Sequence, residues 1–128
     1  MKSFFRQFAQ AVELFNRGFF FECHDLLESI WLDAPSNEKG FYQGILHIAV
    51  GLYHFEAENF KGCINQINKA EIRFQPFLDA YRGVELRGLL ADAEKIKGDA
   101  HFRLTGNKSE LPPAAMPRIQ WEATAFDG

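Results

Sequence analysis

The chain has 128 residues, of which 47% are hydrophobic, and it has a formal charge of -3 and a sequence pI of about 5.8. That length suits one domain, and this apolar content is enough to form a core without disulfides or a structural metal, which excludes a disordered chain. Lysine and arginine are scattered rather than clustered, so the sequence lacks the basic footprint of a nucleic-acid-binding protein.

The cysteines and the apolar runs predict a cytoplasmic protein without a membrane partner. Cys23 and Cys63 lie among apolar residues and are not arranged as Cys-x-x-Cys, so we expect two reduced core thiols. The first residues lack the long apolar run of a signal peptide. Residues 44–55 are the most apolar stretch, but it is short and contains His47 and His54, which indicates a buried helix.

Two helices joined by a tight turn are predicted at the start of the chain. Ser3 can cap a first helix whose apolar residues recur at three- and four-residue spacing, and Gly18 suits the left-handed position that ends it. A second helix is predicted from about Phe19 to Leu32. Within residues 19–21 we expect core packing plus one exposed ring, with a partner-binding surface as the alternative.

A second helical hairpin is predicted after a short polar loop. Its first helix, over about residues 38–57, is apolar nearly all round, which is typical of the central helix of a bundle. Gly44 and Gly51 lie seven residues apart on it, where another backbone could approach closely. Residues 58–59 form a tight turn, and an amphipathic helix follows over about residues 60–75.

The rest of the chain predicts one more helix and a tail. Gly83 opens a fifth helix, and the helical pattern fades beyond Gly98. Residues 111–128 indicate an extended tail, in which Trp121 and Phe126 could attach the chain to the bundle. No segment alternates with a period of two for long enough to predict a strand.

The pattern as a whole predicts an all-α, compact bundle of about five helices. A shift of 40 residues superposes Phe20 on Phe60, and each half then consists of a helix, a tight turn and a helix, similar to a tetratricopeptide hairpin. We expect residues 1–98 to form a single helical domain and residues 99–128 to form an extended tail, partly packed or flexible.

The second predicted helix carries polar side chains beside its apolar face. On a helical wheel, His24, Glu28 and Trp31 are neighbours at spacings of four and three, whereas Glu22 points elsewhere. A buried polar group without a hydrogen bond costs about 1–3 kcal/mol, so we expect these side chains to find partners.

The third predicted helix carries a polar stripe of Gln43, His47 and His54. The two polar stripes are predicted to face each other. In that arrangement the Glu28 carboxylate accepts a hydrogen bond from His47 or Gln43, and His24 completes the cluster.

Three interpretations of this cluster are open. The first is a structural hydrogen-bond network that fixes the register of the two helices. The second is a divalent metal site, with His24 and Glu28 as ligands one turn apart and His47 as a third. The third is a pocket for a small molecule or a peptide, with Trp31, Tyr42, Tyr53 and the histidines as its polar wall. The sequence lacks the paired Glu-x-x-His motifs of di-iron bundles.

One motif points to a known family. The segment Phe20–Trp31 reads F-x-E-x-H-D-x-L-E-x-x-W and is followed by Y-Q-G-I at residues 42–45, and together these resemble a small all-helical family catalogued as domain of unknown function 309. The likeness covers about residues 4–77. It implies a helical bundle found in bacteria and archaea, with no established activity. The polar positions shared by that family would correspond to Glu22, His24, Glu28, Trp31 and Gln43, and not to His47.

The leading functional hypothesis is a non-catalytic helical domain that binds a small ligand or a protein partner at a groove around His24, Glu28, Trp31 and Gln43. The first alternative is a metal-dependent enzyme, such as a hydrolase, with His24 and Glu28 as ligands. The second is a protein-interaction module in which the polar network is purely structural. We expect no nucleic-acid partner, and the phenylalanine triplet and proline-containing tail would suit a homodimer.

Overall fold

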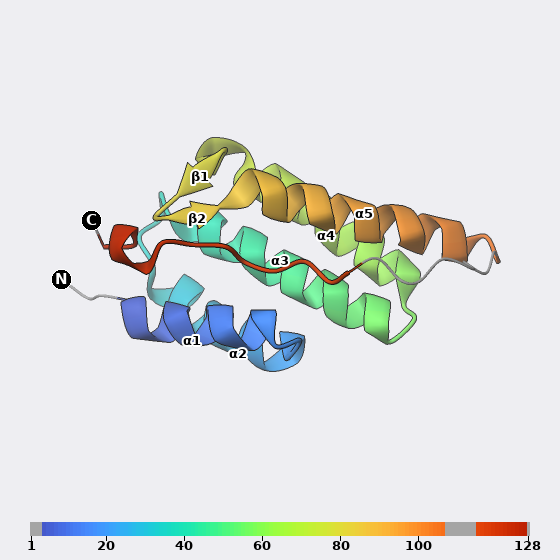
Figure 1. The fold of residues 1–128 in the computed structure, drawn as a ribbon, viewed down its shortest axis with the longest axis horizontal. Coiled ribbons are helices and arrows are strands. Elements are labelled where there is room, and N and C mark those ends of the chain that lie inside the picture. The colour runs from blue at the N-terminus through green and yellow to red at the C-terminus, as the bar shows by residue number, and fades with distance from the viewer. Residues whose placement is uncertain (1–3, 107–114, 128) are drawn as a thin grey trace.

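The computed structural model describes residues 4–106 and 115–127, and within these ranges it contains five α-helices (Figure 1). The helices are α1 (Phe5–Asn16), α2 (Phe20–Asp33), α3 (Lys39–Glu56), α4 (Phe60–Phe74) and α5 (Leu86–Leu104). Each helix packs against its neighbour in sequence. The chain is thus an all-α bundle, as its hydrophobic periodicity predicts. None of the helices in the described part of the chain is long and apolar enough to cross a membrane.

The two helical hairpins, α1–α2 and α3–α4, share the same turn. In the first, Gly18 has a φ of +84°, and the amide after it donates to Leu14 O at 2.9 Å. In the second, Glu58 has a φ of +60°, and the amide after it donates to His54 O at 2.8 Å. Both bonds close the six-residue ring of a Schellman motif. The 40-residue repeat is therefore present in the turns as well as in the helices. Ser3, the predicted cap of the first helix, lies outside the described residues.

Glycines on α3 allow α4 to approach it closely. A Cβ atom on Gly44 would overlap the Phe74 ring, and one on Gly51 would lie 3.4 Å from Cys63 O. The close approach of another backbone, predicted at both glycines, is found at Gly51, whereas the Phe74 side chain fills the space at Gly44, and α4 supplies both neighbours. The side of α3 that bears the glycines therefore faces α4.

A short β-hairpin between α4 and α5 departs from the prediction. After a 3-10 turn at Gln75–Phe77, β1 (Ala80–Tyr81) pairs antiparallel with β2 (Val84–Glu85). Gly83 lies in the hairpin turn with a φ of +80°, so it does not open the fifth helix. The expectation of no strand was wrong because each strand has only two residues, which is too short to show alternation.

The fifth helix extends further than the sequence pattern indicates. It begins at Leu86 and continues through Gly98 to Leu104. The predicted boundary at residue 98 was therefore too early, and residues 99–104 are helical rather than extended. Gly98 lies on the exposed side, where a Cβ atom would meet nothing within 4 Å, while Ala100 continues the buried face. Because Gly98 and Ala100 are both small, the contrast between large apolar and polar side chains that marks a helix is weak in this part of the sequence.

Residues 115–127, here called the C-terminal segment, pass between α1 and α5 across α3 (Figure 1). Phe126 is 1% exposed, and its ring stacks on that of Phe8 with centroids 4.8 Å apart. Trp121 is half-buried, with its ring centroid 5.3 Å from that of Phe8. The aromatic residues of this segment are thus part of the packing of the bundle. A short 3-10 turn at Ala123–Ala125 precedes Phe126.

Candidate functional site

Three of the predicted site residues of α2, His24, Glu28 and Trp31, lie along one edge of that helix. His24 Nε2 is 3.3 Å from Glu28 Oε2 one turn away, and His24 Nδ1 is 3.4 Å from Asp25 Oδ1. The His24 side chain is 25% exposed, and both carboxylates are more than half exposed. The His24–Glu28 contact spans one helical turn, a spacing at which even a fully charged pair contributes only about 0.3–0.5 kcal/mol, so the gain in stability from it is small.

Two buried nitrogen atoms on this edge have no hydrogen-bond partner among the described residues. They are His24 Nδ1 and Trp31 Nε1. The Asp25 carboxylate lies within ion-pair distance of His24 Nδ1 but does not form a hydrogen bond with it. An indole nitrogen can only donate, and most buried polar atoms in proteins are satisfied. A polar group of a binding partner would therefore gain a hydrogen bond at either of these two nitrogens.

Lys39, in the first turn of α3, covers one side of Trp31. Its Nζ donates to Trp31 O at 2.7 Å and to Leu32 O at 3.2 Å, and it lies 4.8 Å from the centroid of the Trp31 ring. Lys39 therefore satisfies two carbonyls at the end of α2 and makes a cation–π contact with the same residue. This contact fixes Trp31 relative to α3.

Two exposed aromatic rings continue this edge toward the first turn of α2. The ring centroids of Phe21 and Tyr53 are 5.7 Å apart, and the two residues are 51% and 44% exposed. The Phe21 ring is also 5.7 Å from that of His24. Phe20 is buried, whereas Phe19 and Phe21 are exposed, so the phenylalanine triplet has two exposed rings rather than the one predicted.

The polar stripe of α3 does not face α2. His47 Nδ1 lies 2.7 Å from Gln66 Oε1 on α4, and His54 contacts a side chain in the turn before α4. The prediction that Glu28 would accept a hydrogen bond from His47 or Gln43 was therefore wrong, and the imidazole near Glu28 is that of its own helix. The cause is the close approach of α4 at the two glycines, because they lie beside the stripe and turn it toward α4.

The environment of His47 favours its neutral form. Burial lowers the pKa of His47, and the charges of Lys69 and Arg73 lower it further, against the opposing effect of the hydrogen bond with Gln66. A neutral ring with its proton on Nδ1 donates to the Gln66 oxygen. His47 thus joins α3 to α4.

Gln43 and Glu22 form no hydrogen bond or ion pair with His24 or Glu28 among the described residues. Gln43 is half-buried on α3, and its side chain forms no hydrogen bond with a described residue. Glu22 is exposed in the first turn of α2, where the helix dipole favours a carboxylate. The helix dipole is thus sufficient to explain an acidic residue at position 22, and no contact with His24 is needed.

Metal-binding and nucleophilic groups are not concentrated at this edge. The described ranges contain no group of three His, Cys, Asp or Glu side chains placed to hold one metal ion. His47 contacts α4, so it is not placed as a third ligand beside His24 and Glu28. Cys23 and Cys63 are buried free thiols, and burial raises the pKa of each to about 12.

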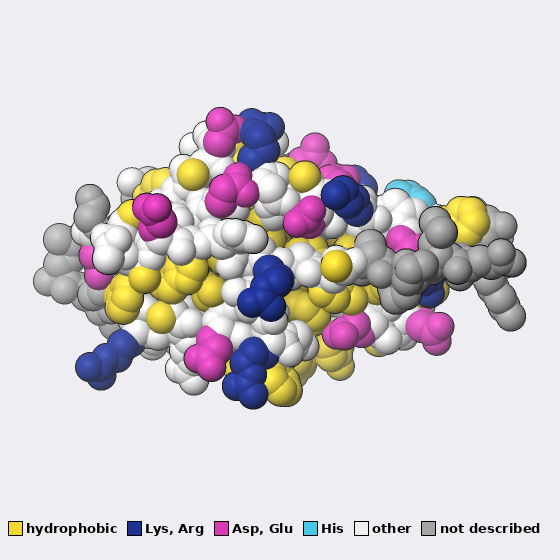
Figure 2. All heavy atoms as spheres, in the orientation of Figure 1, with side chains coloured by type: hydrophobic (Ala, Val, Ile, Leu, Met, Phe, Trp, Pro, Cys, Tyr) yellow, Lys and Arg dark blue, Asp and Glu magenta, His cyan; other side chains and the backbone are white. Residues whose placement is uncertain are grey.

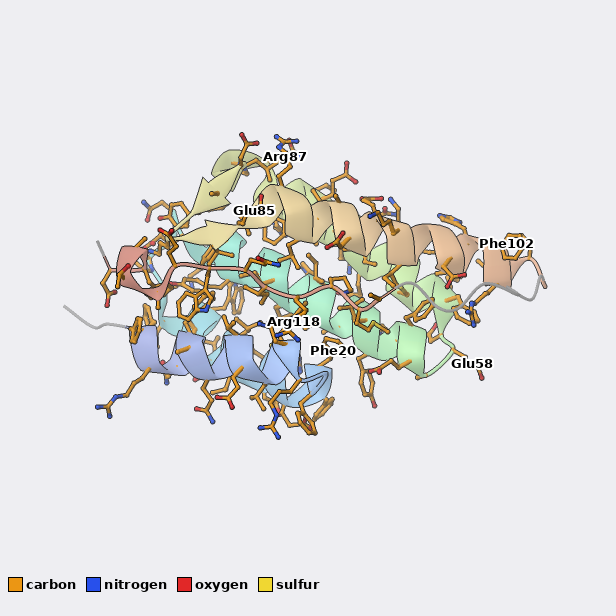
Figure 3. All side chains as sticks on the ribbon, in the orientation of Figure 1. Phe20, Glu58, Glu85, Arg87, Phe102 and Arg118 are labelled. Carbon is orange, nitrogen blue, oxygen red and sulfur yellow. The ribbon has the colours of Figure 1, made fainter. Side chains whose placement is uncertain are left out.

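Two surface pockets lie elsewhere on the molecule. One, of about 410 Å³, lies between α5 and the C-terminal segment, where Glu85 and Arg118 are among its lining residues (Figure 3). The other, of about 390 Å³, lies between α4 and α5. None of the predicted site residues lines either pocket. Figure 2 shows acidic and basic side chains interspersed on the face that includes α5, so that face carries no patch of a single charge.

A second polar cluster was not predicted from the sequence. Glu38, just before α3, is 9% exposed and accepts hydrogen bonds from Arg82 Nε at 2.5 Å and from Tyr81 Oη at 2.8 Å. Arg82 Nη1 also donates to Phe126 O at 2.5 Å. This network joins the start of α3, the β-hairpin turn and the C-terminal segment. The sequence does not reveal this network, because its hydrogen bonds join residues that are 43 or 44 positions apart and no periodicity relates them.

Comparison with known proteins supports the resemblance predicted from the α2 motif. Residues 8–65 match the model of a family described as "Domain of unknown function (DUF309)", which confirms that resemblance. The matched range contains all seven predicted site residues, from Glu22 to His54.

Two bacterial relatives are also similar to this chain. An "Uncharacterized protein" of Aquifex aeolicus (strain VF5) is 28% identical over 103 residues, which are 80% of this chain and 30% of the relative. "Uncharacterized protein YpuF" of Bacillus subtilis (strain 168) is 41% identical over 44 residues, which are 34% of this chain and 25% of that protein. The chain therefore covers less than a third of the length of either relative.

Proposed function

We propose that this chain is a non-catalytic helical domain that binds a protein partner through one surface of the α2–α3 pair. This surface, here called the α2–α3 face, consists of Phe21, His24, Glu28, Trp31 and Tyr53. The observation that carries the proposal is the pair of unpartnered nitrogens, His24 Nδ1 and Trp31 Nε1, on an edge that also exposes two aromatic rings.

The aromatic rings supply the apolar part of such an interface. Phe21 and Tyr53 are each more than 40% exposed and lie against each other. Aromatic residues dominate the binding energy of many protein interfaces because they bury a large area at a low cost in side-chain entropy. A partner that covers both rings removes this apolar area from water.

The unpartnered nitrogens supply the polar part. Trp31 Nε1 requires an acceptor, and a backbone carbonyl of a partner is one. When His24 Nε2 carries the proton toward Glu28, His24 Nδ1 is an acceptor, and a backbone amide of a partner donates to it. Both atoms are covered in the free chain, so we expect the His24 ring and the Lys39 side chain to shift when the partner binds.

The lengths of the relatives favour a protein as the partner. The segments that match this chain make up 30% of one relative and 25% of the other. A module of this size within a longer protein has neighbours to dock against, and interfaces between domains resemble those between separate proteins.

Site-specific photo-crosslinking in cells tests the proposal. A photoreactive phenylalanine analogue replaces Phe21 in one variant and, as a matched control, Ile72 on α4 in another, because Ile72 is also apolar and 69% exposed. We expect a discrete protein adduct from position 21 and none from position 72. Adding Glu28→Ala, a change at an exposed residue, should weaken the adduct.

Two results would contradict this function. Equal adducts from the two positions, or none from either, would mean that the α2–α3 face has no dedicated protein partner. A small molecule retained on the purified chain in native mass spectrometry, and lost in Glu28→Ala, would replace the protein partner with a ligand.

A further inference from the structure

Helix α2 carries a concentration of negative charge. It contains four of the 17 acidic residues of the chain and none of its 14 lysine and arginine residues. These four charges exceed the formal charge of -3 of the whole chain, so the rest of the chain is close to neutral. The excess negative charge of the protein therefore belongs to this one helix.

The acidic side chains of α2 lack the basic neighbours that those of α5 have. Every acidic residue of α5 lies within 3.6 Å of a basic side chain on the same helix, in the pairs Asp92–Lys95, Glu94–Lys97 and Asp99–Arg103. On α2, by contrast, Asp25 and Glu28 form ion pairs only with His24 among the described residues. Glu22 forms no ion pair with a described residue. The charges of these three carboxylates are thus available to a partner.

Two of these carboxylates lie between two exposed apolar side chains. Phe21, Asp25, Glu28 and Leu32, here called the α2 stripe, follow each other at spacings of four, three and four, which places them along one line of the helix. Phe21 and Leu32 are 51% and 61% exposed, and both carboxylates are exposed as well. Residues at these spacings form the seam along which one helix packs on another.

We propose that the partner of the α2–α3 face presents a basic amphipathic helix, which lies along the α2 stripe; this assignment rests on the function proposed above. The partner helix has two apolar residues 11 positions apart, which pack on Phe21 and Leu32. Between them it has lysine or arginine residues, which pair with Asp25 and Glu28. The spacing of the stripe is the same in both directions, so it fits a parallel or an antiparallel helix.

The charges determine which helix is accepted, and the apolar residues hold it. Opposite charges speed the encounter of two proteins, and like charges placed against each other exclude a wrong partner. The apolar contacts at the two ends of the stripe remove Phe21 and Leu32 from water. Main-chain amides and carbonyls at the ends of a helix have no partner within it, and such groups are what His24 Nδ1 and Trp31 Nε1 require.

A synthetic helical peptide tests the charge and the spacing directly. The peptide has leucine at two positions 11 apart and lysine at the fourth and seventh positions after the first leucine, in a background of alanine and glutamine that favours a helix. The control peptide has glutamate in place of both lysines. We expect the lysine peptide to shift the amide NMR signals of residues 21–32 saturably, with an affinity that falls as salt is added. The glutamate peptide should leave these signals unchanged.

Paired variants show whether the stripe is the binding surface. Asp25→Asn combined with Glu28→Gln should weaken binding of the lysine peptide about tenfold and should abolish the photo-crosslinked adduct from position 21. Glu58→Gln combined with Glu71→Gln removes the same charge at two exposed residues elsewhere and should change neither. Asp25→Lys combined with Glu28→Lys should reverse the preference, so that the chain binds the glutamate peptide.

The outcomes separate the basic helix from the protein partner itself. If position 21 forms its adduct and the variant with Asp25→Asn and Glu28→Gln retains it, a protein partner exists but is not basic. A lysine peptide that does not bind, that binds both paired variants equally, or that shifts signals outside α2 would also overturn the basic helix. The absence of any adduct from position 21 would remove the protein partner and the basic helix together.

Discussion

Arg82 Nε lies 2.5 Å from Glu38 Oε1, and this contact joins the turn of the β-hairpin to the start of the central helix. The backbone of Arg82 is in the left-handed region, with a φ of +49°. Its guanidinium also reaches the carbonyl of Phe126, so one side chain connects three parts of the chain that are far apart in sequence.

The charge of Glu38 should make the fold sensitive to acid. Burial raises the pKa of Glu38, but hydrogen bonds from Arg82 and Tyr81 outweigh it, so the pKa lies below its ordinary value of 4.5. A carboxylate whose pKa is lowered in the folded state stabilises the fold fully above about pH 4.5. This contribution is lost as the pH falls through the pKa of the folded state. Glu38→Gln should lower the free energy of unfolding at pH 7 by about 2 kcal/mol.

Urea denaturation at several pH values tests this prediction. The difference between the wild-type chain and Glu38→Gln should shrink as the pH falls below 4.5. Asp92→Asn, a change at an exposed residue of α5, is the control and should alter stability little at any pH. A difference for Glu38→Gln that does not depend on pH would contradict the assigned role of its charge.

The two matching turns allow opposite changes in stability. Glu58 occupies the left-handed position that Gly18 occupies in the first hairpin, and a residue with a side chain costs about 1–2 kcal/mol there. Glu58→Gly should therefore raise the free energy of unfolding by about 1 kcal/mol, and Gly18→Ala should lower it by a similar amount. A Cβ atom at Gly18 meets nothing within 4 Å, so backbone conformation alone is tested. The denaturant concentration at the midpoint of unfolding measures the stability of both variants. If both substitutions moved this midpoint in the same direction, the two turns would not be equivalent.

His47 should make stability depend on pH near neutrality. Because its pKa is lowered in the folded chain, the unfolded chain binds the proton first. The contribution of His47 is complete above its ordinary value of 6.5 and declines as the pH falls through that value. His47→Gln should flatten the dependence of unfolding free energy on pH between 7 and 5.5. His101→Gln, at an exposed position, should not.

Trp31→Phe distinguishes a binding edge from a structural network. The change keeps most of the aromatic packing and removes the buried, unpartnered Nε1–H group. We expect stability to stay level or to rise by about 1 kcal/mol, because a desolvated donor is lost, while the photo-crosslinked adduct becomes weaker. A fall of about 2 kcal/mol or more in the free energy of unfolding would instead support the structural interpretation.

The helices could be predicted because their periodicity is local. Phe8 of α1, Phe20 of α2 and Phe74 of α4 each lie on the apolar face of their own helix and are buried. Which side of α3 faces α4 could not be predicted, because it depends on a contact between Gly44 and Phe74, thirty residues apart. This orientation of α3 places His47 against α4 rather than α2, and so removes His47 from the candidate site.

Edges and termini were also difficult to predict. The strand register of Val84 and Trp121 depends on tertiary pairing over 37 residues, and neither segment is long enough to alternate. On α2, by contrast, the wheel correctly placed His24, Glu28 and Trp31 along one edge. Neighbours within one helix follow from its geometry, whereas contacts between helices do not.

The two faces of α3 are packed by different kinds of contact. Towards α4, Gly44 leaves room for the Phe74 ring and Gly51 lies close to the carbonyl of Cys63, so the absence of two side chains lets the helices meet. Towards α2, the long side chain of Lys39 contacts the Trp31 ring. The proposed contact surface therefore borders the helix pair that is joined by large side chains, and a substitution at Trp31 or Lys39 alters that surface without touching the glycine contact between α3 and α4.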